Sequence, residues 1–99
     1  MRVINFEMDA SPTPGVKYRM YERFTDSGGV TQAPFAPVME DIGQLIFSMP
    51  DTLRDTPFDD GDYEFYVTAY IGDEESVPSN VVTKNFTRPE PPANLVISG

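Results

Sequence analysis

Cysteine, histidine and tryptophan are all absent from the 99 residues of this chain. Without cysteine, the chain forms neither a disulfide framework nor a thiolate metal site. The joint absence of cysteine and histidine removes the usual nucleophile–base pairs, the usual zinc ligands and the usual proton shuttle near neutral pH. We therefore expect no cofactor and no metal, and only carboxylates remain as candidates for catalysis.

Six of the sixteen carboxylates form two acidic clusters, Asp59-Asp60-Gly61-Asp62 and Asp73-Glu74-Glu75. An extended strand between the clusters would hold them roughly 30 Å apart, so they do not share one ion. Neither cluster has the alternating ligand spacing of a helix–loop–helix calcium site. Hydrolysis of a sugar needs two carboxylates about 5–10 Å apart in a cleft, with one pKa raised by an apolar wall. Turn carboxylates in water offer neither, so we expect solvated turns and no enzyme.

Basic residues are scarce. Seven Lys and Arg face sixteen Asp and Glu, which gives a net charge of −9. This balance argues against nucleic acid and anionic membranes as partners, because both bind through basic side chains. No apolar run is long enough for a signal peptide or a bilayer span, so we expect synthesis without a cleaved signal and no membrane insertion.

The composition, 39% hydrophobic and 12% aromatic, is that of a single globular domain. A domain of this size without disulfides or metal must rely on its own core, or a neighbouring chain must help.

Alternation with a period of two dominates the chain, most clearly from Tyr63 to Ile71. A strand sends alternate side chains to opposite faces, so one face of this stretch should be buried and the other exposed. The expected inner side chains are Tyr63, Phe65, Val67, Ala69 and Ile71, and the expected outer ones are Glu64, Tyr66, Thr68 and Tyr70.

Other segments repeat this pattern, and none shows a sustained helical period. Pro34 and Pro37 argue against a central strand, so residues 30–43 should form an edge strand or a loop that crosses the face. We expect an all-β fold, a sandwich or barrel, with strands at 2–8, 16–24, 44–49, 62–71 and 80–86 and at most one helical turn, at 51–55.

Four motifs resemble those of a fibronectin type III domain. They are Asp60-Gly-x-Tyr-x-Phe-x-Val-x-Ala69 (sixth strand), Val77-Pro-Ser-Asn-Val-Val82 (last strand), Val16-Lys-Tyr-Arg-Met-Tyr21 (third strand) and Phe6-Glu-Met-Asp-Ala-Ser-Pro12 (second strand and following loop). The resemblance implies an immunoglobulin-like antiparallel β-sandwich over residues 1–87. Met8 stands near the place where the family usually has a core tryptophan, which implies a softer core.

The family's first strand, with its proline-rich lead, has no counterpart before Val3, but a similar signature follows the last strand. Residues 88–94 are a proline-rich linker and residues 95–99 a strand-like tail that contains Leu95, Val96 and Ile97. The tail could begin a further domain, be a loose linker, or complete a fold that lacks its first strand. The linker, about 25 Å when extended, only just spans one domain. Donation to an adjacent copy is therefore easier than folding back.

A second candidate interface lies on the strands 16–24 and 62–71, which are neighbours in this family. Tyrosine and arginine are enriched where proteins bind. The alternative is cross-strand pairing, with Glu64 facing Arg19 or Arg23. The candidate residues on this face are Lys17, Arg19, Tyr21, Arg23, Tyr66 and Tyr70.

Together these features predict a non-catalytic protein–protein interaction module whose partner is a copy of itself or a larger assembly. The resemblance implies a small structural or decorating subunit, for example of a phage capsid or tail, located in a virion or on the outer surface of an assembly. The alternative is an adhesion, spacer or carbohydrate-binding module from a larger extracellular multidomain protein.

Overall fold

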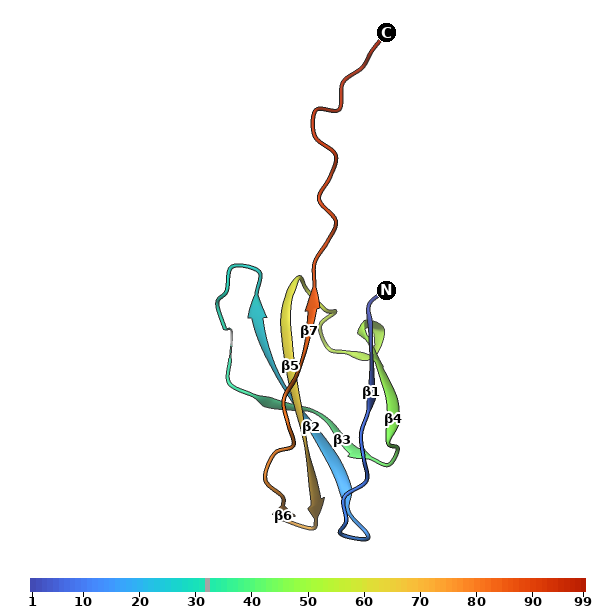
Figure 1. The fold of residues 1–99 in the computed structure, drawn as a ribbon, viewed down its shortest axis with the longest axis vertical. Helices are drawn as coiled ribbons and strands as arrows, with labels where there is room; N and C mark the ends of the chain where they lie inside the picture. The colour runs from blue at the N-terminus through green and yellow to red at the C-terminus, as the bar shows by residue number, and fades with distance from the viewer. Residues whose placement is uncertain (32) are drawn as a thin grey trace.

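The computed structural model describes residues 1–31 and 33–99, in which the chain is all-β and has no α-helix (Figure 1). The one helical turn expected at 51–55 is a short 3-10 helix, η1. The elements are β1 (Val3–Glu7), β2 (Lys17–Asp26), β3 (Ala36–Ile42), β4 (Ile46–Pro50), η1 (Asp51–Leu53), β5 (Gly61–Ile71), β6 (Glu74–Glu75) and β7 (Val82–Phe86).

The strands form two antiparallel sheets. The smaller sheet contains only β1 and β4, with Phe6 opposite Phe47. The larger sheet has the order β3-β2-β5, and both β6 and β7 pair with the edge of β5 that β2 leaves open. The proline-containing stretch 30–43 supplies β3, which is an edge strand with register shifts against β2. The expected strands are thus confirmed, although β6 was not predicted, β2 ends two residues later than expected, and β4 and β7 each start two residues later.

One core joins the two sheets. Ile4 and Met49 from the smaller sheet are buried together with Met20, Tyr63 and Phe65 from the larger one. The rings of Phe6 and Phe65 meet edge to face, with centroids 5.0 Å apart, a geometry that aromatic pairs favour. Burial of apolar side chains is therefore what holds the sheets together.

Two predictions for β5 are wrong. Thr68 lies on the expected outer face, opposite Arg19 and bonded to Glu75, but it was expected to be exposed and is only 4% exposed, because side chains of that face cover it. Ile71 was expected inside but is 51% exposed. It lies at the end of β5, at the hairpin with β6, where the core no longer covers it.

An ion pair closes the flank of the molecule beside β4. Arg54, in the loop after η1, places its two terminal nitrogens 2.5 and 2.7 Å from the carboxylate oxygens of Glu22 on β2. The two side chains are only 11% and 12% exposed. The guanidinium also lies over the ring of Phe58, 4.1 Å from its centroid. Arg54 thereby fastens the loop after the smaller sheet to the larger sheet.

The C-terminal tail does not fold back onto the body. It leaves the end of β7 and continues along the long axis, away from the strands (Figure 1), and the molecule measures 70 × 25 × 22 Å. Leu95, Val96 and Ile97 are 94%, 74% and 95% exposed. The N-terminus lies at the same end of the body as the end of β7 (Figure 1).

Gly61 is the most crowded of the glycines. Its φ is +140°, and a Cβ atom there would lie 2.4 Å from the Thr25 carbonyl oxygen and 2.8 Å from a Phe24 ring carbon. Gly61→Ala should therefore lower the free energy of unfolding by about 1–3 kcal/mol, through backbone strain and the forced shift of β2. Urea denaturation measures this change.

The matched control is Gly43→Ala. Gly43 lies between β3 and β4, and an added Cβ there meets nothing within 4 Å. We expect its free energy of unfolding to change by at most about 0.5 kcal/mol. Equal effects of the two substitutions would contradict this account of Gly61.

Candidate functional site

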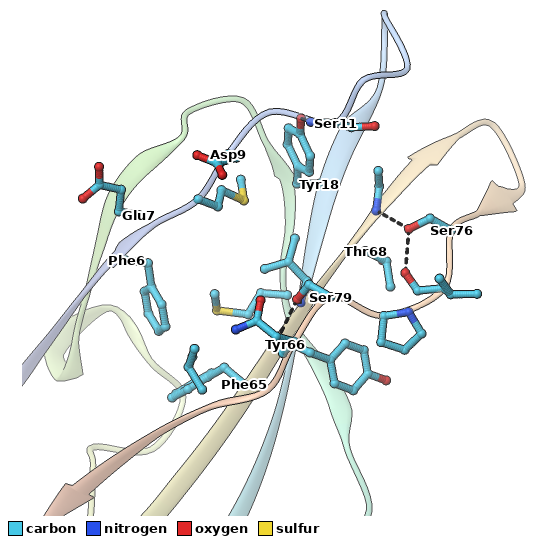
Figure 2. Close-up of a pocket in the computed structure, with 18 of the residues that line it drawn as sticks. Phe6, Glu7, Asp9, Ser11, Tyr18, Phe65, Tyr66, Thr68, Ser76 and Ser79 are labelled. Atoms are coloured by element: carbon cyan, nitrogen blue, oxygen red, sulfur yellow. Dashed lines mark hydrogen bonds between the residues drawn. The ribbon is translucent and has the colours of Figure 1, made fainter.

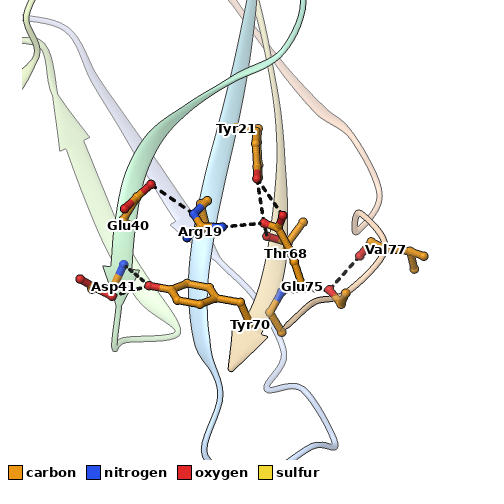
Figure 3. A network of polar contacts seen from close by, with 10 residues as sticks. Arg19, Tyr21, Glu40, Asp41, Thr68, Tyr70, Glu75 and Val77 are labelled. Carbon is orange, nitrogen blue, oxygen red and sulfur yellow. Dashed lines mark hydrogen bonds and ion pairs between the residues drawn. The ribbon is translucent and has the colours of Figure 1, made fainter. Parts of the chain in front are cut away.

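The structure brings the six predicted side chains of β2 and β5 onto one face of the larger sheet. The two strands pair in antiparallel register, with Tyr21 opposite Tyr66 and Lys17 opposite Tyr70. Figure 3 shows part of the resulting network. We call this surface the Arg-Tyr face, and it consists of Lys17, Arg19, Tyr21, Arg23, Tyr66 and Tyr70.

Arg19 is the centre of the Arg-Tyr face and has carboxylates on both sides. Its Nε lies 3.2 Å from Glu40 on β3, and its Nη1 lies 3.1 Å from Glu75 on β6. The guanidinium also stacks over the Tyr70 ring, 4.3 Å from its centroid (Figure 3). The charge of Arg19 is thus already balanced within the chain.

The other two cations of this face are also paired. Arg23 donates from Nε and Nη2 to one oxygen of Glu64, at 3.0 and 2.8 Å. This is the cross-strand pairing that the sequence offered as the alternative. Lys17 lies 3.7 Å from Asp41, with both side chains well exposed. Exposed pairs of this kind contribute little to stability, but they cancel much of the positive charge that an acidic partner would need.

Glu75 gathers three donors at the edge of the Arg-Tyr face. It accepts hydrogen bonds from the Thr68 hydroxyl at 2.5 Å, the Tyr21 hydroxyl at 2.7 Å and Arg19 at 3.1 Å (Figure 3). These bonds, first that from Thr68 and then that from Tyr21, hold the pKa of the Glu75 carboxyl below its usual value. Glu75 was expected in a solvated turn, so this role was not predicted. The two-residue strand that carries Glu75 back beside β5 has no strong sequence signal.

Aromatic rings complete the face. Tyr21 and Tyr66 stack with centroids 4.8 Å apart, and Phe35 packs against Tyr66 at 4.8 Å. Arg23 lies over the Phe35 ring at 4.5 Å. Phe35 was not predicted as part of this face, because it lies in a proline-rich segment without a clear pattern. The Arg-Tyr face is therefore an ordered surface whose charges and rings already have partners.

A groove runs between the two sheets on the flank opposite Arg54. Its volume is about 660 Å³, and Figure 2 shows Phe6 and Glu7 on one side and Ser76 on the other. Hydrophobic side chains from both sheets line it, and Val82 beside it remains 46% exposed. We call this the β1 groove, and the apolar residues that line it include Phe6, Met8, Met20, Phe65, Val67 and Val82.

The wall of the β1 groove opposite β1 is built by two serines. Ser76 and Ser79 donate their backbone N–H groups to the carbonyls of Ala69 and Val67. Their hydroxyls then accept hydrogen bonds from the N–H groups of the same two residues, at 3.0 and 2.9 Å. The serine hydroxyls thus accept the hydrogen bonds that carbonyl groups of a paired strand would normally accept. The irregular segment around Pro78, between β6 and β7, is thereby held against β5. The groove depends on this arrangement, which the sequence analysis did not predict.

The other wall of the β1 groove ends in an unpaired strand edge. In the described residues β1 pairs only with β4. The Met8 N–H donates to the Leu45 carbonyl. In an antiparallel pair, only every second residue forms hydrogen bonds with the partner strand. The N–H and C=O groups of Val3, Asn5 and Glu7 therefore point away from β4. These groups border the groove and offer hydrogen bonds to an added strand.

The acidic clusters have structural partners. Asp60 lies 2.6 Å from Arg2 and 3.5 Å from Arg88, and the hydrogen bond from Arg2 lowers the pKa of the Asp60 carboxyl. Among the described residues, no group of acidic side chains has the arrangement needed to hold a metal ion. No helix in the same residues is long and apolar enough to cross a membrane.

Comparison of the chain with protein-family models, with curated proteins and with solved structures finds no match. The candidate site therefore has to be interpreted from its own geometry.

The hydrogen bonds to Glu75 predict a pH dependence of stability. Because its pKa is lowered in the folded protein, its contribution is fully present above the unfolded pKa, about 4.3. That contribution is lost as the pH falls through the folded pKa. Glu75→Gln should melt below the wild type at pH 7, and the difference in Tm should shrink as the pH falls below about 4.3.

Glu74→Gln is the control for this experiment, because it removes the same charge from the neighbouring residue of β6. Melting curves of the three proteins between neutral and acid pH separate the local effect from the change in net charge. A difference in Tm between wild type and Glu75→Gln that stays constant with pH would contradict the role of the ionised carboxylate.

Proposed function

We propose that this chain is a non-catalytic protein–protein interaction module that joins a larger assembly through its C-terminal tail. The observation that carries the proposal is the exposure of Leu95, Val96 and Ile97 at 94%, 74% and 95%. Three consecutive branched apolar side chains lie on an arm that points away from the body (Figure 1). Exposed apolar segments of this kind mark sites of protein contact.

The linker supports this role. Residues 88–92 contain three prolines in the sequence Arg-Pro-Glu-Pro-Pro, and such segments are stiff and extended. A stiff arm has little conformational freedom to lose on binding, so less of the binding free energy is spent on ordering it. The arm therefore presents the tail at a distance from the acidic body.

The larger assembly follows from the proposed family. The two antiparallel sheets and their common core are compatible with a fibronectin type III-like β-sandwich. We extend the proposal to a small structural or decorating subunit of a virion, such as a phage capsid or tail. This extension rests on the resemblance of the four sequence motifs to that family.

Removal of residues 93–99 tests the role of the tail. The shortened chain should keep its Tm at low protein concentration, because the side chains of Leu95, Val96 and Ile97 are largely exposed. It should lose self-association or binding to the assembly, as measured by size exclusion with light scattering at high concentration. If deletion leaves both stability and assembly unchanged, the tail has no such role and the proposal fails.

Salt distinguishes tail-mediated contact from contact through the Arg-Tyr face. Two copies of net charge −9 repel each other, whereas residues 93–99 contain no charged side chain. Raising the ionic strength screens the repulsion and leaves apolar burial intact. We expect association of the full chain to become tighter, by severalfold, between low and moderately high salt in sedimentation equilibrium. Weaker association at high salt would instead favour ion pairing through the Arg-Tyr face.

A further inference from the structure

We infer that the β1 groove is the acceptor for the tail of a second copy, with residues 93–99 added as a strand along the open edge of β1. This inference rests on the proposed function and names its partner and its site. The smaller sheet is incomplete. It has two strands, and two-stranded sheets are marginal unless a third strand or further packing supports them.

The other strand edges are poorer acceptors. The free edge of β4 contains Pro50, which has no N–H to donate, and the flank beside it is closed by the Arg54–Glu22 ion pair. The edge of β3 contains Pro37 and follows register shifts against β2, and both features hinder strand addition. The edge of β1 has no proline and borders an apolar groove. It is therefore a better site for an added strand than the edges of β3 and β4.

The pattern of the tail fits this site. In an extended strand, Leu95 and Ile97 share one face while Val96 takes the other. Directly opposed residues of an antiparallel pair share a face, so Leu95 and Ile97 would join Phe6 and Met8 in the groove. The seven residues 93–99 span about 23 Å and the five residues of β1 about 17 Å, so the tail is long enough to cover the edge. It also has no charged side chain to desolvate.

The direction of the tail favours a second copy over the same chain. The tail leaves the end of the body at which β1 begins, and it points outward (Figure 1). To reach its own groove it would have to reverse sharply within the proline-rich linker and then run parallel to β1. A copy stacked along the long axis in the same orientation receives the tail at the far end of its β1. There the tail runs antiparallel to β1 without a reversal. Repetition of this contact gives a head-to-tail string, or a ring if it closes.

Disulfide trapping tests the inference in a background without cysteine. In the expected pairing Val96 faces solvent opposite Asn5 or Glu7, and all three positions are exposed. Opposed Cα atoms in such a pair are about 5.5 Å apart, within the range of a disulfide. A Val96→Cys chain is mixed with an Asn5→Cys or a Glu7→Cys chain, oxidised mildly, and analysed by intact mass spectrometry.

The matched control is a mixture of Val96→Cys with Thr83→Cys, since Thr83 is an exposed residue of β7 away from the groove. We expect at least a tenfold higher yield of the mixed disulfide with Asn5→Cys or Glu7→Cys than with Thr83→Cys. Because every substituted side chain is exposed, the variants should fold, and circular dichroism verifies this.

Each other outcome overturns the inference in a distinct way. An internal disulfide in the dilute double variant Asn5→Cys with Val96→Cys, without mixed dimers, would place the tail in its own groove. Equal yields with the control would mean that the tail binds elsewhere. In that case the proposed function still stands if deletion of residues 93–99 abolishes association. If deletion has no effect, both the inference and the proposed function fail.

Discussion

The packing of two strands against a much wider sheet is the constraint on which the rest of this structure depends. β1 and β4 cover only part of the larger sheet, in which β3, β2 and β5 lie side by side and β6 and β7 continue beyond them. The contact of Phe6 with Phe65 fixes where the smaller sheet lies. On the β4 side, the loop with Arg54 covers the remaining core. On the β1 side none of the described residues covers it, and Val82, on the same side of its strand as the packed Phe86, stays half exposed. The groove is therefore a direct consequence of the number of strands.

The second constraint is the distribution of charge over the molecule. The chain has a large excess of acidic residues, yet every cation of the Arg-Tyr face lies close to a carboxylate of the same chain. Glu75, Glu64 and Asp41 thus convert a basic strip into a nearly neutral, aromatic surface. The remaining acidic charge stays on the body and keeps copies apart at long range. Residues 93–99, in contrast, contain no charged side chain.

The sequence predicts most of the strands, because alternation over Tyr63–Ile71 and the turn residues between segments are strong local signals. It also predicts that the side chains of β2 and β5 share a face, since period-two alternation fixes that once the strands are neighbours. It does not predict the partners on that face. Glu75 reaches Thr68 only because the β6 hairpin brings it back beside β5. The groove is likewise invisible in the sequence. It depends on the serine hydroxyls that bond to Val67 and Ala69 and on the absence of a strand beside β1. Such non-local contacts leave no period in the chain.

The open strand edges of this molecule differ in how well they are protected against pairing with other chains. This difference favours strand addition at one edge over non-specific aggregation. Exposed edges normally invite aggregation, and proline, charge and irregular pairing reduce that risk. β3 has proline and register shifts, β4 ends in Pro50, and β7 carries Lys84. β1 has the exposed Glu7. Its carboxylate repels the acidic body of another copy, whereas a strand without charged side chains is not repelled. An edge that repels the body of a neighbour and admits only its neutral tail would allow assembly without aggregation. The features that leave the small sheet incomplete would then also select the proposed partner, the tail of a second copy.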